Sequence, residues 1–271
     1  MNIGRIIYRV QAMEAGIIPV AHGKLLHGAM FNMLNDNSTE LAANIHDNIR
    51  FKPFTLSPLR LLGIKKAKMV SRYRIKCGQL ADICLSAFSD ELIQAFSNIN
   101  EGYIFEIGKI HFRLQCVFYR PEQHEEAVIL SREAFMAGIS SNAPELIKIC
   151  YITPTTFRID TSDYPFPEPR LVWGSLAMKW NQLDMPESVD VVACKALAEQ
   201  VVPWRWSGNT ERLIFNKNIS VTGFVGTFTY SLFNLEEAQK RMFCRLACFA
   251  EFSGIGRLTA QGMGQVRVEN I

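Results

Sequence analysis

The chain has 271 residues, of which 48% are hydrophobic and 20% charged, and its formal net charge is +3. The length suits one large domain or two ordinary ones, and the apolar content is enough for a buried core. These values exclude a disordered, coiled-coil or collagen-like chain. Seven cysteines are scattered without a CxxC pair, which favours reduced core residues over a disulfide framework or a zinc ribbon.

The amino-terminal ten residues, MNIGRIIYRV, alternate like a strand and lack the apolar region of a signal peptide. The sequence also has no run of about 18 apolar residues that would span a membrane. We therefore expect a cytoplasmic protein that does not insert into a membrane.

The first half of the chain predicts the element order β-α-β-β-α-β, which is the ferredoxin-like unit. Strands are expected over residues 3–10, 51–59, 67–77 and 104–118, and helices over residues 23–34 and 80–96.

The second half predicts the same order. Strands are expected over residues 146–159 with an interruption at Pro154, over 212–215 and 220–232 as a hairpin, and over 265–268; helices are expected over 171–183 and 235–252. The linker RPEQHEE at 120–126 is rich in charge and contains proline. We therefore predict an α+β protein with tandem ferredoxin-like domains at 1–122 and 123–271 and a C-terminal glycine-rich loop.

Charge is unevenly distributed along the chain. Residues 48–81 contain no Asp or Glu and carry nine cations: Arg50, Lys52, Arg60, Lys65, Lys66, Lys68, Arg72, Arg74 and Lys76. The remaining residues hold 29 − 9 = 20 cations against 26 carboxylates, a net charge of −6. Alternation places Arg72, Arg74 and Lys76 on one strand face. A solvated face is one interpretation, but the absence of compensating carboxylates favours a polyanionic partner.

A glycine-rich segment, GIGRLTAQGMGQVRV, begins at residue 254 between the last predicted helix and the last predicted strand. Glycines let the backbone approach a ligand closely, so this loop and its arginine are candidates to bind a phosphate backbone. The order helix, loop, strand differs from the P-loop and from the dinucleotide fingerprint, which disfavours a nucleotide cofactor.

Proton-transfer candidates come from the five histidines. His22 and His27 flank the start of the first predicted helix. His46 precedes Lys52 by six residues; an imidazole can exchange a proton near neutral pH, and an ammonium can stabilise charge on a phosphoryl oxygen. By itself, each of these histidines could equally be structural.

Aromatic residues alternate at Phe224, Phe228 and Tyr230 in GFVGTFTY, a pattern also found in RNA-recognition motifs. A half-buried strand produces the same alternation, so we favour core packing over base stacking. Cys244 and Cys248 lie one helical turn apart among apolar residues. Because buried thiols behave as small hydrophobic side chains, we expect both to pack in the core and not to bind a metal.

Four stretches together resemble one family: IHDNIRFKPFTLSPL (45–59), YITPTTFRI (151–159), GFVGTFTYSL (223–232) and FAEFSGIGRLTAQGMGQVRV (249–268). They are similar to the CRISPR-associated endoribonucleases that process precursor CRISPR RNA, within the repeat-associated mysterious protein superfamily. The resemblance implies tandem ferredoxin-like domains and no cofactor or metal. It also implies cleavage by the ribose 2′-hydroxyl, leaving a 2′,3′-cyclic phosphate and a 5′-hydroxyl.

The resemblance assigns site residues as well. His46 corresponds to the family's catalytic histidine and Lys52 to its charge-stabilising lysine. The first-helix tyrosine of some members is Phe31 here, which makes His27, one turn earlier, the candidate to assist His46. Residues expected to bind RNA are Arg50, Lys65, Lys66, Lys68, Arg72, Arg74, Lys76, Gly254, Gly256, Arg257, Gln261, Gly262 and Gly264.

The expected partner is CRISPR repeat RNA, with other subunits of an effector complex as further candidates. Two alternatives stay open. The first is a repeat-RNA-binding subunit of such a complex without catalytic activity, suggested by Phe31 in place of the tyrosine. The second is a ferredoxin-like metabolic or regulatory domain that binds a small anion.

Overall fold

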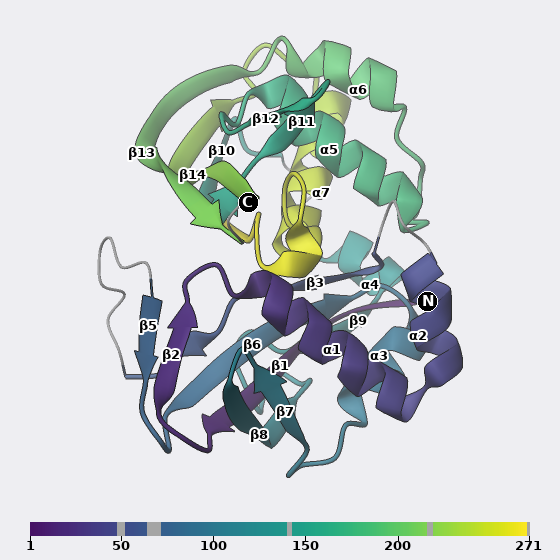
Figure 1. Ribbon diagram of the computed structural model, residues 1–271. Helices are drawn as coiled ribbons and strands as arrows, with labels where there is room; N and C mark the ends of the chain where they lie inside the picture. Colours follow the sequence, from purple (N-terminus) through teal and green to yellow (C-terminus); the bar gives the residue numbers. More distant parts are fainter. Residues whose placement is uncertain (48–51, 64–71, 140–142, 216–218, 270–271) are drawn as a thin grey trace. The chain divides into compact units, whose positions relative to one another are not determined.

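The computed structural model describes residues 1–47, 52–63, 72–139, 143–215 and 219–269 (Figure 1). The chain divides into two compact units. The first comprises Met1–Leu130 and Ala260–Gly262, and the second Ser131–Thr259 and Met263–Ile271. By their contacts, residues 123–130 belong to the first unit. The domain limits 1–122 and 123–271 stay a prediction.

The first unit is built on an antiparallel sheet with the strand order β3-β6-β1-β8-β7. These strands are β1 (Asn2–Ala12), β3 (Phe54–Leu56), β6 (Leu80–Ala87), β7 (Ile104–Ile107) and β8 (Ile110–Phe118). The short strands β4 (Arg60–Leu61) and β9 (Val128–Ser131) pair with β6 and β1. A separate ribbon joins β2 (Gly16–Pro19) to β5 (Arg72–Ile75).

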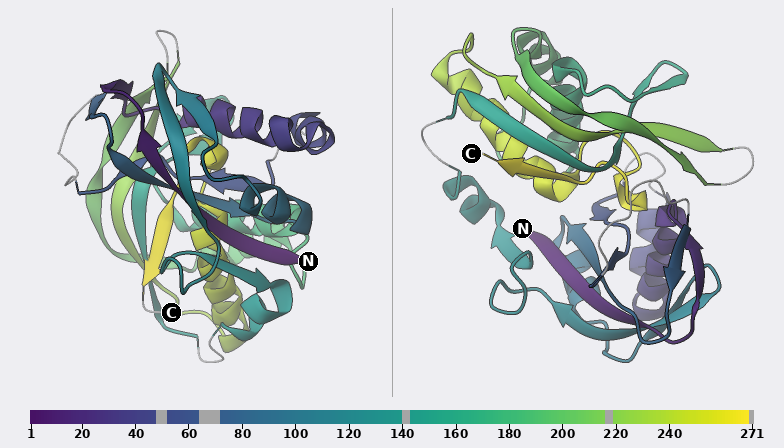
Figure 2. Two further views of the ribbon diagram at one scale, coloured as in Figure 1. Left: turned by 90° about the horizontal axis from the view of Figure 1, so that it is seen from below. Right: turned by 90° about the vertical axis from the view of Figure 1, so that its left-hand side faces the viewer.

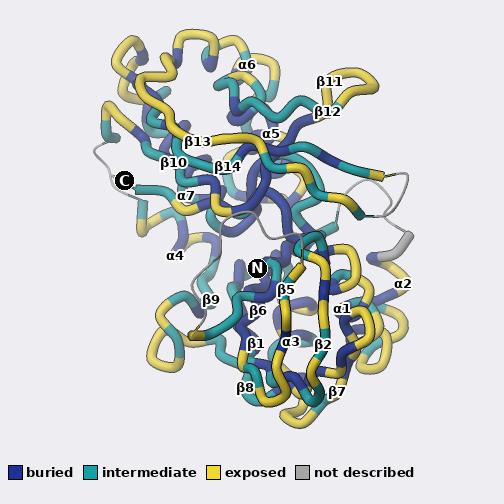
Figure 3. The backbone as a smooth tube through the Cα atoms, turned by 60° about the vertical axis from the view of Figure 1, so that its left-hand side comes forward, coloured by how far each residue is buried: buried dark blue, intermediate teal, exposed yellow. Residues whose placement is uncertain are grey.

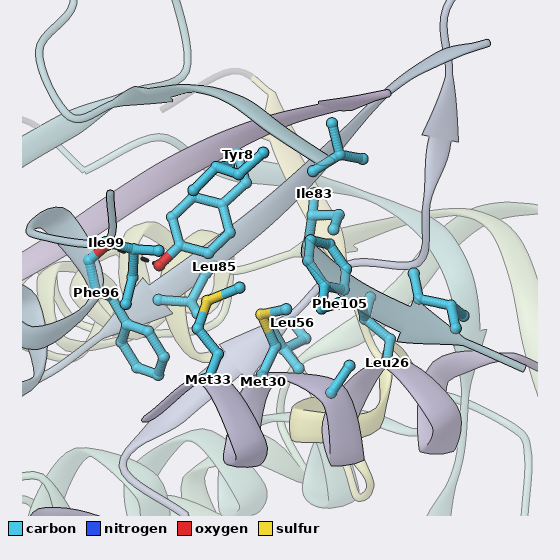
Figure 4. Close-up of a cluster of buried hydrophobic side chains, with 14 of the residues drawn as sticks. Tyr8, Leu26, Met30, Met33, Leu56, Ile83, Leu85, Phe96, Ile99 and Phe105 are labelled. Carbon is cyan, nitrogen blue, oxygen red and sulfur yellow. Dashed lines mark hydrogen bonds between the residues drawn. The ribbon is translucent and has the colours of Figure 1, made fainter. Parts of the chain in front are cut away.

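Helices α1 (Gly23–Asn37), α2 (Thr39–Asp47) and α3 (Asp90–Ser97) complete this unit. Leu26, Met30 and Met33 lie on one side of α1 because they are spaced by four and three residues, and they point into the core under the sheet (Figure 4). The buried Tyr8 hydroxyl donates a hydrogen bond to the main-chain oxygen of Phe96 at 2.7 Å. This bond joins β1 to α3 inside an otherwise apolar core.

The helix predicted over residues 80–96 is wrong. The structure has β6 there, followed by α3, whose N-cap Ser89 accepts a hydrogen bond from the Leu92 amide at 3.3 Å. Residues 81–87 are buried without alternation because β6 lies in the middle of the sheet. A strand covered on both faces reads as a continuous apolar run, which periodicity alone does not distinguish from a buried helix.

The second unit has an antiparallel sheet with the order β13-β14-β10-β15. Its strands are β10 (Leu146–Thr155), β13 (Val202–Ile214), β14 (Ser220–Ser231) and β15 (Val266–Glu269), and the small hairpin β11 (Phe157–Ile159) and β12 (Ser162–Tyr164) lies apart from them. The helices are α4 (Arg132–Ala137), α5 (Pro169–Gln182), α6 (Val191–Ala198) and α7 (Glu237–Ser253), with the 3-10 turn η1 (Thr259–Gln261).

Both sheets follow the βαββαβ order, so the predicted tandem ferredoxin-like fold is confirmed. The strands of the first unit are β1, β3, β6 and β8, with α1 and α3 between them. Those of the second are β10, β13, β14 and β15, with α5 and α7 in the corresponding places. In the second unit Trp173 of α5 packs edge-to-face on Tyr230 of β14, at 5.9 Å between ring centres.

The second half departs from the sequence analysis at several elements. Helix α6 was not predicted, and the strand expected over 212–215 is the end of the longer β13, which pairs with β14 throughout (Figure 2). Almost all of β13 is exposed (Figure 3). Pro154 lies within β10, where the pairing register with β14 shifts and a missing amide is tolerated.

The predicted core packing of Phe224, Phe228 and Tyr230 is confirmed, since all three are buried. Among the cysteines, the expectation of core packing is wrong for Cys77, which is exposed. Cys244 is buried and Cys248 half-buried, and the two thiols are hydrogen-bonded to each other. Within the described residues, no helix is long and apolar enough to cross a membrane.

Candidate active site in the first unit

Helix α1 places His27 in an aromatic cluster of the first unit. Its half-buried imidazole stacks on Phe54 of β3, with 5.7 Å between ring centres and 19° between planes. Phe31, one turn further along α1, meets the same imidazole edge-on at 4.8 Å. The two phenyl rings therefore hold the imidazole from two directions.

The polar contact of the His27 imidazole is with the glycine-rich segment. Nδ1 lies 2.9 Å from the main-chain oxygen of Ala260, which belongs to the first unit and to its buried core. Burial lowers the pKa of His27, the Ala260 carbonyl opposes that shift, and the charge of Lys52 adds to it. The lowered pKa favours the uncharged imidazole, the form that can accept a proton.

Lys52 lies beside this cluster and against the end of α2. Its Nζ donates a hydrogen bond to the carbonyl of Ile45 at 2.6 Å and lies 5.6 Å from the centre of the Phe31 ring. A cation is favoured at a helix C-terminus, where carbonyl groups point outward. Lys52 thus contacts the helical turn that also contains the backbone of His46.

The predicted catalytic residues are only partly described. His46 is the penultimate residue of α2, but its side chain lies outside the described part of the structure. The structure does bring His27, Phe31 and Lys52 into contact. Their positions along the sequence could not predict this grouping. Their catalytic roles stay predictions.

His22, the other histidine at the start of α1, has a different environment. It is fully buried; Nδ1 lies 2.9 Å from the Pro19 carbonyl oxygen, and Nε2 accepts a hydrogen bond from the Leu59 amide at 2.9 Å. Burial lowers its pKa. Because both ring nitrogens are engaged, His22 holds the start of α1 against the segment after β3.

Exposed cations follow the β2–β5 ribbon. Arg72 and Arg74 lie on the exposed face of β5, Ile75 is buried, and Lys76 is exposed just beyond the strand. The predicted sharing of one face by Arg72 and Arg74 is confirmed, while their binding of RNA stays a prediction. Arg50, Lys65, Lys66 and Lys68 lie outside the described residues.

The expectation that the basic segment lacks compensating carboxylates is wrong at Arg60. Its guanidinium binds both carboxylate oxygens of Glu126, at 2.8 and 2.7 Å. Glu126 follows the segment by 45 positions along the chain (126 − 81 = 45), and only the tertiary structure brings it back. One of the nine cations is therefore neutralised within the first unit.

The glycines of the C-terminal loop allow close contacts with the protein's own backbone. A Cβ on Gly256 would lie 2.2 Å from the Thr156 oxygen, and one on Gly264 would lie 2.1 Å from the Ile255 oxygen. Gly254 and Gly262 share the positive φ angles of these two residues, at 62° and 83°. Tight packing thus accounts for these glycines, and RNA contact by them stays a prediction.

Arg257 of the same loop is ion-paired with Asp163, which also contacts Arg158 at 3.1 Å. An RNA phosphate at Arg257 would have to compete with this carboxylate. Gln261 contributes its main chain, since a Cβ on Gly23 at the start of α1 would lie 1.7 Å from the Gln261 carbonyl oxygen. Because Gly23 has no side chain, residues 260–262 can pack in the first unit. The sequence analysis did not predict this contact.

Comparison with known proteins supports the resemblance from the sequence motifs. A family model described as CRISPR-associated endoribonuclease Cas6 matches residues 149–266. Cas6 proteins of two Mycobacterium tuberculosis strains, CDC 1551 / Oshkosh and ATCC 25618 / H37Rv, are 28% identical over 123 residues. This stretch covers 45% of the chain and only 38% of the length of those relatives.

Solved structures match almost the whole chain. Thermus thermophilus Cas6 (TTHB231) has a TM-score of 0.73 at 25% identity, over 98% of each chain. The Cas6 (TTHB231) product complex has a TM-score of 0.77 at 24% identity, over 97% of this chain and 98% of that one. The Cas6 (TTHA0078) substrate mimic complex has a TM-score of 0.73 at 23% identity, over 99% and 100%.

Two ferredoxin-like units, with a glycine-rich segment between the last helix and the last strand, are the fold that this chain shares with solved Cas6 structures. The family model and the curated relatives agree with this likeness over less than half of the chain. The chain is therefore similar to the CRISPR-associated endoribonucleases of the Cas6 family, in sequence over residues 149–266 and in fold along almost its whole length.

Proposed function

We propose that this protein is an endoribonuclease that cleaves CRISPR repeat RNA within precursor transcripts. The observation that carries the proposal is the grouping of the His27 imidazole with the ammonium of Lys52 around Phe31, at the helical turn that contains the backbone of His46. Its Cas6 relatives, including those solved as product and substrate mimic complexes, add support.

The proposed reaction uses a nucleophile that the RNA itself supplies. A ribose 2′-hydroxyl attacks the adjacent phosphate, the bond to the 5′-oxygen breaks, and a 2′,3′-cyclic phosphate and a 5′-hydroxyl result. His27 and His46 are the candidates to remove the 2′-proton and to protonate the leaving oxygen. Lys52 is the candidate to stabilise the charge that grows on the phosphorane. This division of roles needs no metal ion.

The test is cleavage of end-labelled cognate repeat RNA in excess EDTA. We expect one specific product pair with a 2′,3′-cyclic phosphate, and no product when the nucleotide 5′ to the mapped cleavage site carries a 2′-deoxyribose. His46→Ala should slow single-turnover cleavage about 10²–10⁴-fold, the usual contribution of an acid or base, with unchanged RNA affinity.

The matched control is His111→Ala, because His111 is exposed and its ring contacts Glu14, at 2.9 Å, on the surface of the first unit. This variant should cleave at the wild-type rate. Cleavage that is abolished by EDTA, or that is unaffected by His46→Ala, would contradict the proposed mechanism.

A second candidate function is repeat-RNA binding without cleavage, as a subunit of a CRISPR effector complex. The phenyl ring of Phe31 favours it, because it contacts both the imidazole of His27 and the ammonium of Lys52 but has no hydroxyl to transfer a proton. Tight binding of repeat RNA by the wild-type protein with no product after prolonged incubation would select this function.

A further inference from the structure

We infer that the main-chain carbonyl of Ala260, in the glycine-rich segment, holds His27 as the Nδ1–H tautomer and leaves the Nε2 lone pair available as a general base. The catalytic part of this inference rests on the proposed function. The tautomer itself rests on the geometry of the first unit alone.

The hydrogen bond sets the position of the proton. Nδ1 of His27 and the Ala260 oxygen are 2.9 Å apart, and a carbonyl oxygen can only accept. Nδ1 must therefore carry the hydrogen, and Nε2 of the neutral ring carries the lone pair. Among the residues that the structure describes, the hydrogen bond of this ring is the one at Nδ1. In water a neutral imidazole favours the other tautomer, so this one requires a fixed acceptor.

The aromatic neighbours prevent the imidazole from turning to exchange its two nitrogens. Phe54 covers one face of the ring at 19° between planes, and Phe31 meets it at 60°. Burial and the charge of the Lys52 ammonium both lower the pKa of His27. Both effects favour the neutral form of the ring.

The Ala260 carbonyl is in turn held by glycines. Gly23, at the start of α1, leaves room for the Gln261 carbonyl, which would lie 1.7 Å from a Cβ there. Gly262 has a φ of +83°, and a Cβ on it would lie 3.2 Å from the Pro58 ring. Because Ala260 directly precedes these two residues and is itself buried, its carbonyl has little freedom to leave His27. The glycine-rich segment therefore positions a catalytic side chain, besides any contact that it makes with RNA.

The first measurement is the tautomer in the full chain. Two-bond ¹H–¹⁵N NMR spectra of uniformly labelled protein at pH 7 to 8 report which ring nitrogen is protonated, and His27→Gln identifies the His27 signal. We expect a protonated Nδ1 and an unprotonated Nε2. A His27 signal with a protonated Nε2, or one averaged between both tautomers, would overturn the inference.

The second measurement displaces the carbonyl. Gly23→Ala places a methyl group where the Gln261 carbonyl lies, so we expect a mixed tautomer and single-turnover cleavage slowed about 10²-fold at saturating RNA. Gly28→Ala is the matched control, because Gly28 follows His27 on the same helix and a Cβ there meets nothing within 4 Å. It should keep the wild-type tautomer and rate. Full activity of a folded Gly23→Ala protein would contradict the positioning role.

A third variant covers the case that Gly23→Ala fails to fold. The amide nitrogen of Asn occupies the place of Nδ1, so His27→Asn keeps a donor for the Ala260 carbonyl but has no base. We expect a wild-type melting temperature and at least about 10²-fold slower cleavage. Cleavage at the wild-type rate by this variant would show that His27 is not the general base. If the wild-type protein has the expected tautomer but never cleaves RNA, the proposed function fails and the tautomer stands.

Discussion

Lys179 is a buried cation that the proposed chemistry does not use. It lies on α5 in the second unit, and its Nζ donates hydrogen bonds to the carbonyls of Ser253 and Gly254 at 3.0 and 2.9 Å. The side chain is 8% exposed, and burial lowers its pKa from 10.5 to about 7. Lys179 thereby closes the C-terminal end of α7, where the glycine-rich segment begins.

This burial predicts a pH-dependent free energy of unfolding. Between pH 7 and 10.5 the unfolded lysine is protonated and the folded one is neutral, so raising the pH stabilises the protein, by up to about 1.4 kcal/mol per pH unit. Below pH 7 both states are protonated and the contribution is constant. Urea unfolding at pH 7, 8 and 9 measures the effect.

Lys179→Met should remove this rise, because the difference in stability between wild type and variant isolates the lysine from other titrating groups. Lys24→Met, an exposed position on α1, is the matched control and should keep the wild-type pH dependence. Identical pH dependence in wild type and Lys179→Met would contradict the assignment.

At the scale of elements, basic side chains from other segments bind the C-terminal carbonyls of the long helices α5 and α7 in the second unit. Arg132, at the start of α4, is 7% exposed and donates to the Leu183 carbonyl at 2.6 Å and to the Asp184 carbonyl, just beyond α5. These oxygens are among the groups that a helix C-terminus leaves without an intrahelical partner. A buried guanidinium supplies the hydrogen bonds and opposes the helix dipole.

Removing this guanidinium should destabilise the second unit. Arg132→Ala leaves buried carbonyls without donors, so we expect a loss of about 2–4 kcal/mol in the free energy of unfolding. Arg170→Ala removes an exposed arginine on α5, which is 4.0 Å from Glu199, and should cost under about 1 kcal/mol. Chemical denaturation of both variants measures the difference, and equal losses would refute the role of Arg132.

For the whole molecule, the near-neutral net charge conceals a basic segment and an acidic remainder. The structure refines this distribution, because Glu126 neutralises Arg60 and Asp163 neutralises Arg257. Arg72 and Arg74 stay exposed on the β2–β5 ribbon. These two are therefore the described cations that we expect to contribute most to binding of a polyanion.

The salt dependence of RNA binding tests this expectation. If Arg72 and Arg74 each contact one phosphate, the double variant Arg72→Ala/Arg74→Ala should weaken binding and reduce the slope of log K against log salt by about 1.4, because each contact to single-stranded RNA contributes about 0.7. Lys24→Ala/Lys109→Ala removes two other exposed cations of the first unit and should leave the slope unchanged. An unchanged slope in the first variant would exclude both arginines from the RNA path.

The sequence by itself determined the tandem ferredoxin-like fold class, the alternation of Arg72 and Arg74, and the core packing of Phe224, Phe228 and Tyr230. These features depend on local periodicity, which can be read directly from one amino-acid sequence. It misassigned residues 80–87 as helix because a strand buried on both faces has no polar alternation. It also missed most of β13, which is exposed at nearly every position.

Only the tertiary structure decided which distant groups meet. It paired Arg60 with Glu126 and Arg257 with Asp163, and it brought Ala260 to His27 across 233 positions of the chain. Sequence spacing constrains neighbours along a helix or a strand, whereas such contacts depend on how sheets and loops pack. His27 could therefore be named as a candidate from the sequence. The Ala260 carbonyl, which we infer to fix the tautomer of its ring, could not.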